Sequence, residues 1–414
     1  MDLKHFKNLQ LLDVHTGTLK PGHEVLVRDE IIAQVAAGPI QAPEAEVFDL
    51  GGRTLMPGLI DCHVHVCAEG MRAYPTLPRS LVTAIAFKEL EDTLMRGFTT
   101  ARDAGGADLG IKMAIERGLV TGPRLFVSGY PISQTGGHGD GRSQGDCCQM
   151  TECQQLSTYK HIADGVDAVR KAAREEIRKG ADQVKIMASG GVASPSDPID
   201  RLQYADDELR AVVDEARRAN TYVMAHVYTD IAIRRVVEAG IRSIEHGNLL
   251  GDETAGRMAD KDAFLVPTLI VYRIITEHGR DLGVSDLHLS KAKQILETGT
   301  RSIEIAKTAG VKMAYGTDLF RAPSDHECEE FLVRSEVLSA AEIIRSATVI
   351  GAELIRMENR LGVIAPDAYA DLLVVDGNPL EDLGLLQDQG RHLPAIIKGG
   401  VFVKNRLSPP GPND

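Results

Sequence analysis

Eight strand-like segments alternate with helix-length segments through the middle of this 414-residue chain. The strand candidates are residues 54–66, 98–103, 124–129, 183–187, 222–226, 243–246, 264–269 and 312–318. The clearest helix candidates are residues 80–96, 165–179, 206–219 and 229–239. This alternation is typical of a parallel sheet, and eight units favour an α/β fold of the closed (β/α)8 TIM barrel type. A doubly wound open sheet is the alternative, which the lack of a Gly-x-Gly-x-x-Gly loop after the first strand disfavours.

The two ends of the chain have a different sequence pattern, in which short strand-like segments alternate with turns that contain glycine or proline. Examples are residues 23–27, 45–49, 370–375 and 400–403. Because both ends are strand-rich and the middle is not, we predict that they pair into one small β-sandwich domain. This composite domain takes residues 1–57 plus 357–414, and the barrel domain takes residues 58–356. The last residues, 408–414, are predicted to form a disordered tail.

Composition excludes several classes of protein. A hydrophobic content of 43% with 25% charged residues is that of a soluble globular protein, and a net charge of −13 argues against nucleic acid as a partner. No uninterrupted apolar run is long enough for a membrane span, and the first residues lack the pattern of a secretory signal. The six cysteines form no disulfide framework, so we expect a reducing, cytoplasmic location. A loop with Cys147, Cys148 and Cys153 is either a small metal site or, as its spacing favours, a set of free thiols.

Three long connections follow predicted strands, at residues 130–164, 188–205 and 319–328. Connections of this length in a compact domain are usually functional. Active sites of barrels form at the carboxyl ends of the strands, where these connections begin. The first of them contains His138 within a glycine-rich stretch.

Six side chains that can bind metal ions lie at or near the ends of predicted strands. They are His63, His65, Lys185, His226, His246 and Asp318. Residues two apart in a strand point the same way, so His63 and His65 predict a pair of imidazole ligands. Each residue alone has an ordinary alternative, such as a hydrogen-bonded histidine, or a helix N-cap for Asp318. Together, at the same end of the barrel, they predict a metal centre.

Lys185 lies between Val184 and Ile186 in a predicted buried strand, where a charged amine is costly to desolvate. One interpretation is a lysine paired with a carboxylate, or one that extends to the barrel mouth. The other is a neutral amine that has reacted with CO2 to form a carbamate, which would supply an anionic oxygen to each of two metal ions.

The chain resembles the amidohydrolase superfamily, in the binuclear-metal type with a carboxylated lysine. The matching segments are Pro57–His65 (PGLIDCHVH), Lys185, His226, Ser243–Gly247 (SIEHG), Gly316–Asp318 (GTD) and Leu361–Val375 (LGVIAPDAYADLLVV). Within that superfamily, residues 105–106, 133–138 and 184–191 are similar to the prolidase-like or Xaa-Arg/Lys dipeptidase branch, loosely called imidazolonepropionase-like. The branch removes the C-terminal residue of dipeptides and N-acyl amino acids, and includes hydrolases of bulky amides such as ochratoxin A, an N-acyl phenylalanine.

The resemblance implies two divalent metal ions, for which zinc fits histidine-rich ligation best. His63, His65 and Asp318 would hold one ion, His226 and His246 the other, and carboxylated Lys185 would bridge them. Asp318 would act as general base and then general acid. His138 is expected to assist at the substrate carbonyl or to bind the substrate carboxylate, and Tyr228 to bind that carboxylate. The sequence does not choose among Arg102, Arg142 and Arg321 as further partners of a carboxylate.

The predicted activity is therefore hydrolysis of a small-molecule amide, namely Xaa-Pro, Xaa-Arg or Xaa-Lys dipeptides or N-acyl phenylalanines. The first alternative is a cyclic amide hydrolase on the same scaffold. The second is a heterocycle deaminase, which Lys185 disfavours because such relatives typically use one metal ion. A non-catalytic barrel is disfavoured because no ligand has been lost. Relatives often form large homo-oligomers, which we also expect for this chain.

Overall fold

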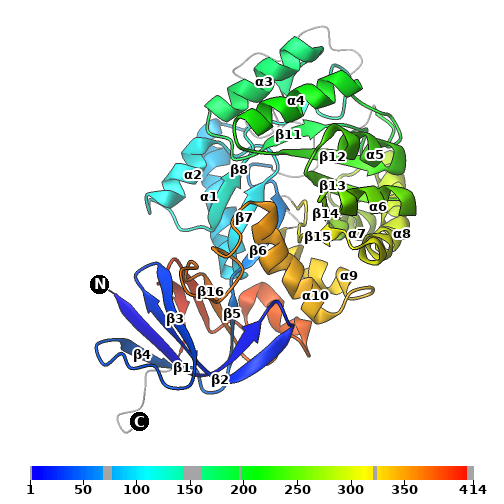
Figure 1. Cartoon of the computed structure of the whole chain (residues 1–414). Coiled ribbons are helices and arrows are strands. Elements are labelled where there is room, and N and C mark those ends of the chain that lie inside the picture. Colours follow the sequence, from blue (N-terminus) through cyan, green and yellow to red (C-terminus); the bar gives the residue numbers. More distant parts are fainter. Residues whose placement is uncertain are drawn as a thin grey trace. The chain divides into compact units, whose positions relative to one another are not determined.

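The computed structural model describes residues 2–68, 77–140, 142, 161–194, 197–319 and 324–407. The chain divides into two compact units. The first comprises the described residues of Met1–Asp61, Glu91–Thr100 and Arg334–Asp414, and the second those of Cys62–Leu90 and Ala101–Val333. Figure 1 shows the elements of each unit, which are described separately below.

The first unit is built on one eight-stranded sheet that joins both ends of the chain. Its order is β18-β17-β16-β5-β1-β2-β3, with β4 pairing with β1. The strands are β1 (Leu3–Asp13), β2 (Thr18–Arg28), β3 (Ile31–Ala37), β4 (Glu46–Asp49), β5 (Thr54–Pro57), β16 (Leu372–Val375), β17 (Ala395–Lys398) and β18 (Val401–Asn405). β5 pairs antiparallel with β16, and Leu55 of β5 lies opposite Val374 of β16. Distant parts of the sequence therefore share this sheet. The predicted sandwich form and the boundaries at residues 57 and 357 stay predictions.

Short helices in the first unit follow the sheet's N-terminal half in sequence. They are α10 (Ala340–Arg345), the π-helix η3 (Ser346–Ile350), α11 (Gly351–Leu354) and the 3-10 helices η4 (Leu383–Leu386) and η5 (Asp388–Gly390). α10 begins with a capping box in which the Ser339 hydroxyl accepts from the Glu342 backbone and the Glu342 carboxylate accepts from the Ser339 backbone. This exchange satisfies two backbone donors that a helix start leaves without partners.

Gly58 connects β5 to the next strand and has no room for a side chain. A Cβ atom at this position would lie 2.0 Å from Thr99 Oγ1 and 2.8 Å from Thr99 Cβ. We therefore expect Gly58→Ala to lower the free energy of unfolding by about 1–3 kcal/mol, because overpacking displaces neighbouring atoms. Gly256→Ala is the control, since its Cβ meets nothing within 4 Å. Urea denaturation measures both, and equal stabilities for the two variants would contradict the packing argument.

The second unit contains a parallel sheet of seven strands in the order β10-β9-β11-β12-β13-β14-β15. These strands are β9 (Ile132–Ser133), β10 (His161–Ile162), β11 (Val184–Met187), β12 (Val223–Thr229), β13 (Ser243–Leu249), β14 (Phe264–Val266) and β15 (Lys312–Met313). A three-stranded sheet, β6-β7-β8, consists of β6 (Leu59–Val64), β7 (Phe98–Asp103) and β8 (Arg124–Val127). The first three residues of β6 and of β7 fall within the ranges of the first unit. The parallel α/β organisation is therefore as predicted, and the regular strand ladders form two sheets.

Two backbone hydrogen bonds connect the edges of these sheets. The Cys62 amide of β6 donates to the Tyr315 carbonyl at 2.9 Å, just beyond β15. At the other edge, the Asp182 amide, just before β11, donates to the Val127 carbonyl of β8 at 2.7 Å. Residues 314–318 thus lie along β6 although they fall outside a formal strand, which is why the predicted strand 312–318 is only two residues long here.

Helices follow most strands of the second unit. They are α1 (Arg79–Met95), α2 (Leu109–Glu116), α3 (Val166–Arg178), α4 (Asp206–Arg218), α5 (Asp230–Ala239), α6 (Asp252–Asp260), α7 (Leu269–His278), α8 (Asp286–Ala309) and α9 (Glu330–Arg334), with the 3-10 helix η2 (Ser324–Glu329). Helices α3, α4, α5 and α6 lie side by side in sequence order (Figure 1). The four predicted helices overlap α1, α3, α4 and α5, whereas the 24-residue α8 was not predicted.

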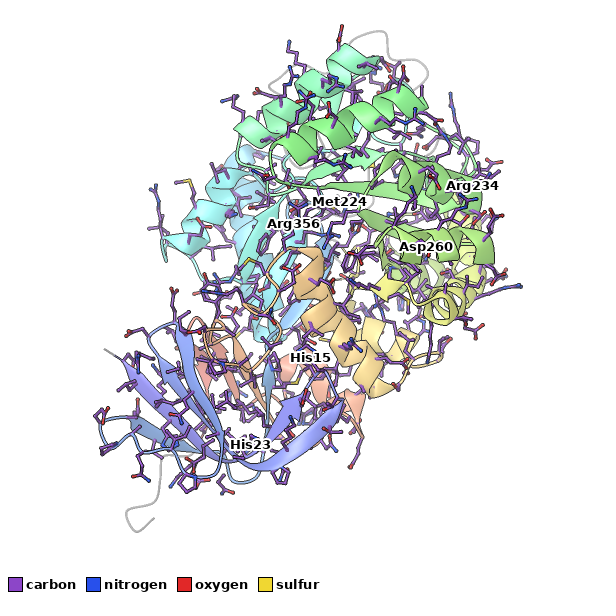
Figure 2. The ribbon with its side chains drawn as sticks, viewed as in Figure 1. His15, His23, Met224, Arg234, Asp260 and Arg356 are labelled. Carbon is purple, nitrogen blue, oxygen red and sulfur yellow. The ribbon has the colours of Figure 1, made fainter. Side chains whose placement is uncertain are left out.

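Helical periodicity explains how these helices cover the strands. In α4, Leu209, Val212, Val213 and Ala216 are buried, at the spacing of one helix face. Met224 of β12 is fully buried among the strands, whereas Arg234 of α5 and Asp260 of α6 are exposed (Figure 2). In the part of the chain that the structure describes, no helix is long and apolar enough to cross a membrane.

Several predictions fall on residues outside the described ranges. The cysteine loop of Cys147, Cys148 and Cys153, Arg321, and the predicted disordered tail all lie there. The three long connections are described only in part, and the first contains the two short strands β9 and β10.

Candidate functional site

The six predicted metal-binding residues lie on strands or just beyond a strand's carboxyl end. Lys185, His226 and His246 lie on β11, β12 and β13, which are neighbours in the sheet. In the parallel register His226 is opposite Glu245, and Val227 is opposite His246. His63 lies on β6 and His65 one residue beyond it, while Asp318 follows β15. The parallel pairing of β11 with β12 and of β12 with β13 therefore carries Lys185, His226 and His246 on neighbouring strands of one sheet.

Asp318 is the centre of the cluster. Its Oδ1 atom lies 3.3 Å from Nε2 of both His63 and His65, and its Oδ2 atom lies 3.9 Å from Nδ1 of His246. One ligand atom each from His63, His246 and Asp318 lie within 4.8 Å of one another. These three residues could hold a metal ion without a large rearrangement.

Hydrogen bonds at Nδ1 orient the His63 and His65 rings so that their Nε2 atoms face Asp318. His63 Nδ1 lies 2.6 Å from Glu245 Oε2, and His65 Nδ1 lies 2.8 Å from the Gly105 carbonyl oxygen. Because these acceptors require a proton on Nδ1, the Nε2 lone pairs face Asp318, as in a ligating histidine. His226 Nε2 is buried and has no hydrogen-bond partner among the described residues. A buried nitrogen lone pair without a donor fits a metal ligand, and the residue set fits the metal that the sequence implies.

The His226 and His246 rings contact each other and two hydroxyl groups. His226 Nδ1 lies 2.9 Å from His246 Nε2, and His246 Nδ1 lies 2.8 Å from Thr268 Oγ1 and 3.1 Å from the Tyr272 hydroxyl. Burial lowers the pKa of both histidines well below the usual value, so both rings are neutral near pH 7. Burial would raise the pKa of Asp318, but the nearby rings of His63 and His65 hold it well below its usual range.

The backbone at three of these positions is strained. His246, Thr268 and Asp318 have φ values of 69°, 47° and 57°. This left-handed region is costly for residues other than glycine, and such strain is commonly found at functional sites.

A fully buried ion pair lies behind His63. Arg102 Nη2 lies 3.0 and 3.1 Å from the two carboxylate oxygens of Glu245, and Arg102 Nε donates to the Cys62 carbonyl at 2.6 Å. Arg102 Nη1 also donates to Ser243 Oγ at 3.1 Å. Burial would raise the pKa of Glu245, but the Arg102 charge and the His63 hydrogen bond hold it far below its usual range. The Arg102 guanidinium is therefore paired with Glu245 inside the protein, so Arg102 is no longer a candidate for binding a substrate carboxylate.

Arg102→Met tests this internal role. The variant leaves the buried Glu245 carboxylate without its cation, so we expect a loss of about 3–5 kcal/mol in the free energy of unfolding. Arg117→Met is the matched control, because Arg117 is exposed at the end of α2. Denaturant unfolding measures both variants. Stability losses within about 0.5 kcal/mol of each other, as for surface substitutions, would contradict the assigned role.

Lys185 is buried, with 1% of its surface exposed. Its amine makes no hydrogen bond or ion pair with the described residues, although Glu245 and Asp318 are near enough to act on it electrostatically. Burial lowers the pKa of Lys185 to about 8, against the opposing effect of those two carboxylates. The neutral amine, which is the form that reacts with CO2, is therefore more populated near pH 7 than in an ordinary lysine.

The two predicted substrate-binding residues lie against the predicted ligands. The His138 ring stacks on His226 with centroids 4.1 Å apart, and His138 Nδ1 lies 3.3 Å from Asp197 Oδ2. The Tyr228 ring stacks on His246 at 5.0 Å, and its hydroxyl lies 2.7 Å from that of Tyr272. Arg142, the other described arginine candidate, binds Asp140 at 2.7 Å.

Sequence reasoning missed several residues around the site. Glu245 and Asp197 are buried carboxylates, and Thr268 and Tyr272 contact His246. Glu245 had a usable signal, because a carboxylate between Ile244 and His246 in a buried strand raises the same desolvation question as Lys185. The other three lie in connections or helices where no periodicity marks them.

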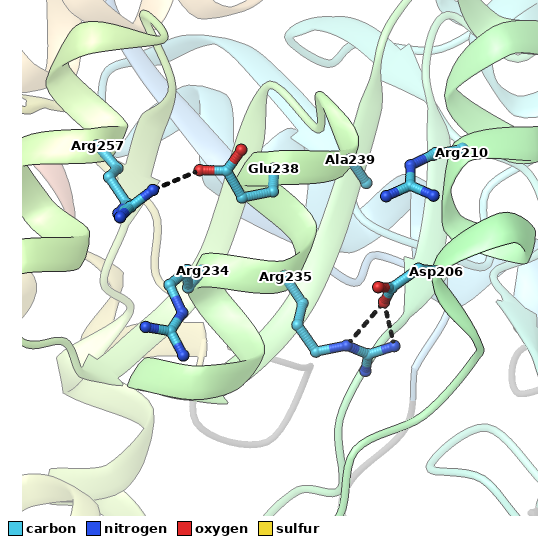
Figure 3. A pocket seen from close by; sticks show the side chains of 7 residues that line it. All are labelled: Asp206, Arg210, Arg234, Arg235, Glu238, Ala239 and Arg257. Atoms are coloured by element: carbon cyan, nitrogen blue, oxygen red, sulfur yellow. Dashed lines mark hydrogen bonds and ion pairs between the residues drawn. The ribbon is translucent and has the colours of Figure 1, made fainter.

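A separate surface hollow of about 330 Å³ lies over helices α4, α5 and α6 (Figure 3). It is lined by Asp206, Arg210, Arg234, Arg235, Glu238, Ala239 and Arg257. Arg235 pairs with Asp206 at 2.8 Å, and Arg257 with Glu238 at 3.1 Å. None of the predicted site residues lines this hollow, and chemistry rather than hollow size identifies the histidine cluster as the candidate site.

Comparison with known proteins agrees with this site. Residues 54–402 match the amidohydrolase family, and the chain belongs to that family. It falls in the prolidase and ochratoxinase branch, so the predicted family and branch are confirmed. Ochratoxinase of Aspergillus niger is 32% identical over 373 residues, which cover 84% of this chain and 75% of ochratoxinase.

Two solved structures are closely similar over almost the whole chain. A crystal structure of an amidohydrolase is 47% identical with a TM-score of 0.95, covering 98% of this chain and 100% of that one. A crystal structure of a prolidase complexed with N-methylphosphonate-L-proline is 46% identical with a TM-score of 0.95, covering 97% of this chain and 100% of that one.

Proposed function

We propose that this chain is a metal-dependent hydrolase that cleaves the amide bond of dipeptides or N-acyl amino acids. The observation that carries the proposal is the convergence of His63, His65 and His246 on Asp318, beside a buried His226 nitrogen that has no hydrogen-bond partner among the described residues. The substrate class is supported by the similar prolidase, whose ligand is a proline phosphonate, and by the similarity to ochratoxinase. Xaa-Pro, Xaa-Arg, Xaa-Lys and N-acyl phenylalanine substrates are the candidates.

The residues present would hold two divalent ions, for which zinc is the best match. His63, His65 and Asp318 would hold one, His226 and His246 the other, with carboxylated Lys185 between them. When bound, such ions supply Lewis acidity and lower the pKa of water at the site.

The chain's own groups complete the chemistry. Asp318 would take a proton from the attacking water and return it to the leaving amine as the amide C–N bond breaks, so that water and amide become acid and amine. His138 would donate to the substrate carbonyl or carboxylate oxygen, and Tyr228 to the carboxylate. For the fold, we propose the closed (β/α)8 barrel, supported by the backbone bonds of Cys62 with Tyr315 and of Asp182 with Val127.

Metal content per chain, measured together with the release of free amino acid from the four substrate types, tests the proposal. We expect about two ions per chain and cleavage of at least one type. Two ions without cleavage of any of them would reject the dipeptidase and N-acyl amino acid activity and favour the cyclic amide alternative. One ion or none after metal supplementation would reject the binuclear centre.

A further inference from the structure

Helix α8 carries a lysine whose ammonium group binds a backbone segment beside the candidate site. Lys291 Nζ donates to the carbonyl oxygens of Gly191 at 2.9 Å, Ser194 at 3.0 Å and Asp197 at 2.8 Å. An ammonium group has three N–H donors, and all three are used here. Lys291 is only partly exposed, and it lies 94 to 100 residues from these partners in the sequence.

The segment that Lys291 binds is in contact with the site histidines at one end. Gly191 lies against both stacked rings, since a Cβ atom there would be 2.4 Å from His138 Cε1 and 2.6 Å from His226 Nε2. The backbone of Gly191 can approach this closely because it has no side chain. A shift of this backbone would therefore press on His138 and His226 or leave a gap beside them.

At its other end the segment orients His138. The Asp197 side chain is fully buried, and its Oδ2 atom lies 3.3 Å from His138 Nδ1 and 3.1 Å from Gln203 Nε2. Gln203 Oε1 in turn accepts from the His138 backbone amide at 3.0 Å. His138 is thus held through both its ring and its backbone, and the Asp197 carbonyl is bound by Lys291. Burial would raise the pKa of the Asp197 carboxyl, but the hydrogen bond and charge of His138, with a smaller effect of the Lys291 charge, hold it below its usual value.

We propose that Lys291 is a positioning residue, which holds Gly191 and Asp197 so that the His138 ring stays stacked on His226 and available to the substrate. The role in turnover rests on the proposed function, whereas the positioning of His138 does not. A lysine suits the task better than an arginine, because three carbonyl oxygens surround one compact ammonium, whereas a guanidinium presents a flat fork.

Lys291→Met keeps the length of the side chain and removes the charge and all three donors. Lys293→Met is the matched control, because Lys293 is exposed on the same helix. We expect Lys291→Met to lower kcat/KM by about 10- to 100-fold, the scale of a displaced substrate-positioning group, and Lys293→Met to leave it unchanged. Metal content should be the same in both variants.

A double-mutant cycle with His138→Asn separates positioning from a general loss of stability. If Lys291 acts through His138, Lys291→Met should lower kcat/KM by less than about 3-fold in the His138→Asn background. A full additional 10- to 100-fold loss in that background would overturn the proposal. Equal activity of Lys291→Met and the unmodified enzyme would overturn it as well.

Two measurements do not depend on a known substrate. In Lys291→Met, hydrogen exchange should accelerate at the His138, Gly190 and Gln203 amides, and the His138 ring resonance, assigned with His138→Asn, should shift in the NMR spectrum. If the protein cleaves none of the four substrate types, the proposed function fails while these results still decide the positioning role. Unchanged exchange and an unchanged His138 resonance would reject it.

Discussion

Asp318→Asn should slow turnover by about 10²–10⁴-fold, the range expected if Asp318 is the general acid–base group. Asparagine keeps the shape of the side chain but cannot accept and return a proton. It also replaces a charged oxygen that lies 3.3 Å from both His63 Nε2 and His65 Nε2, so metal content should fall as well. The measurement is kcat on the best substrate of the panel, with metal content determined on the same sample.

Asp260→Asn is the control for this change, because Asp260 is exposed at the end of α6. It should retain full activity and metal. A near-normal kcat in metal-loaded Asp318→Asn would show that another residue is the base, and Asp318 would then be at most a ligand.

Lys185→Ala should remove both metal and activity. We expect metal content to fall below one ion per chain and kcat/KM to drop by more than about 100-fold. This loss exceeds the effect of removing a residue that only supports a metal ligand through a hydrogen bond. The physical reason is that a carbamate on this buried amine would be the anionic group between the two pairs of histidines. Elemental analysis and steady-state kinetics measure the two effects.

Rescue distinguishes a missing ligand from a damaged fold in this variant. Short carboxylic acids fit the space left by the side chain and should restore part of the activity of Lys185→Ala. Lys312→Ala is the control, because Lys312 lies on β15 and pairs with Asp262 at 2.6 Å, away from the cluster. Full activity in Lys185→Ala without any added acid would reject the carbamate.

The sequence predicted the chemistry of the site because that information is local. His63 and His65 are two residues apart in one predicted strand, and Lys185 lies between apolar neighbours in another. These short-range patterns can be recognised without knowing which residues from other parts of the chain lie nearby. The same locality made the family recognisable, as the match over residues 54–402 confirms. The roles of the individual residues as ligands and catalysts stay predictions.

Element boundaries were less accurate where pairing rather than composition determines them. β12 continues to Thr229 although the predicted strand ends at His226, and β15 is shorter than predicted because residues 314–318 bond to neighbouring backbone outside a regular ladder. The long helix α8 was missed although its buried residues run from Ala292 to Ala306 at helical spacing, because several of them, such as Gly299 and Ser302, are small or polar and weaken the apolar pattern.

By itself, the sequence determined which side chains can do chemistry and the order of strands that carries them. Only the tertiary structure decided their supporting contacts. Glu245 reaches His63 across 182 residues of sequence, Arg102 reaches Glu245 across 143, and Lys291 reaches Gly191 across 100. These contacts depend on how strands and helices pack in three dimensions, and no spacing or periodicity along the chain encodes a distance between two segments so far apart.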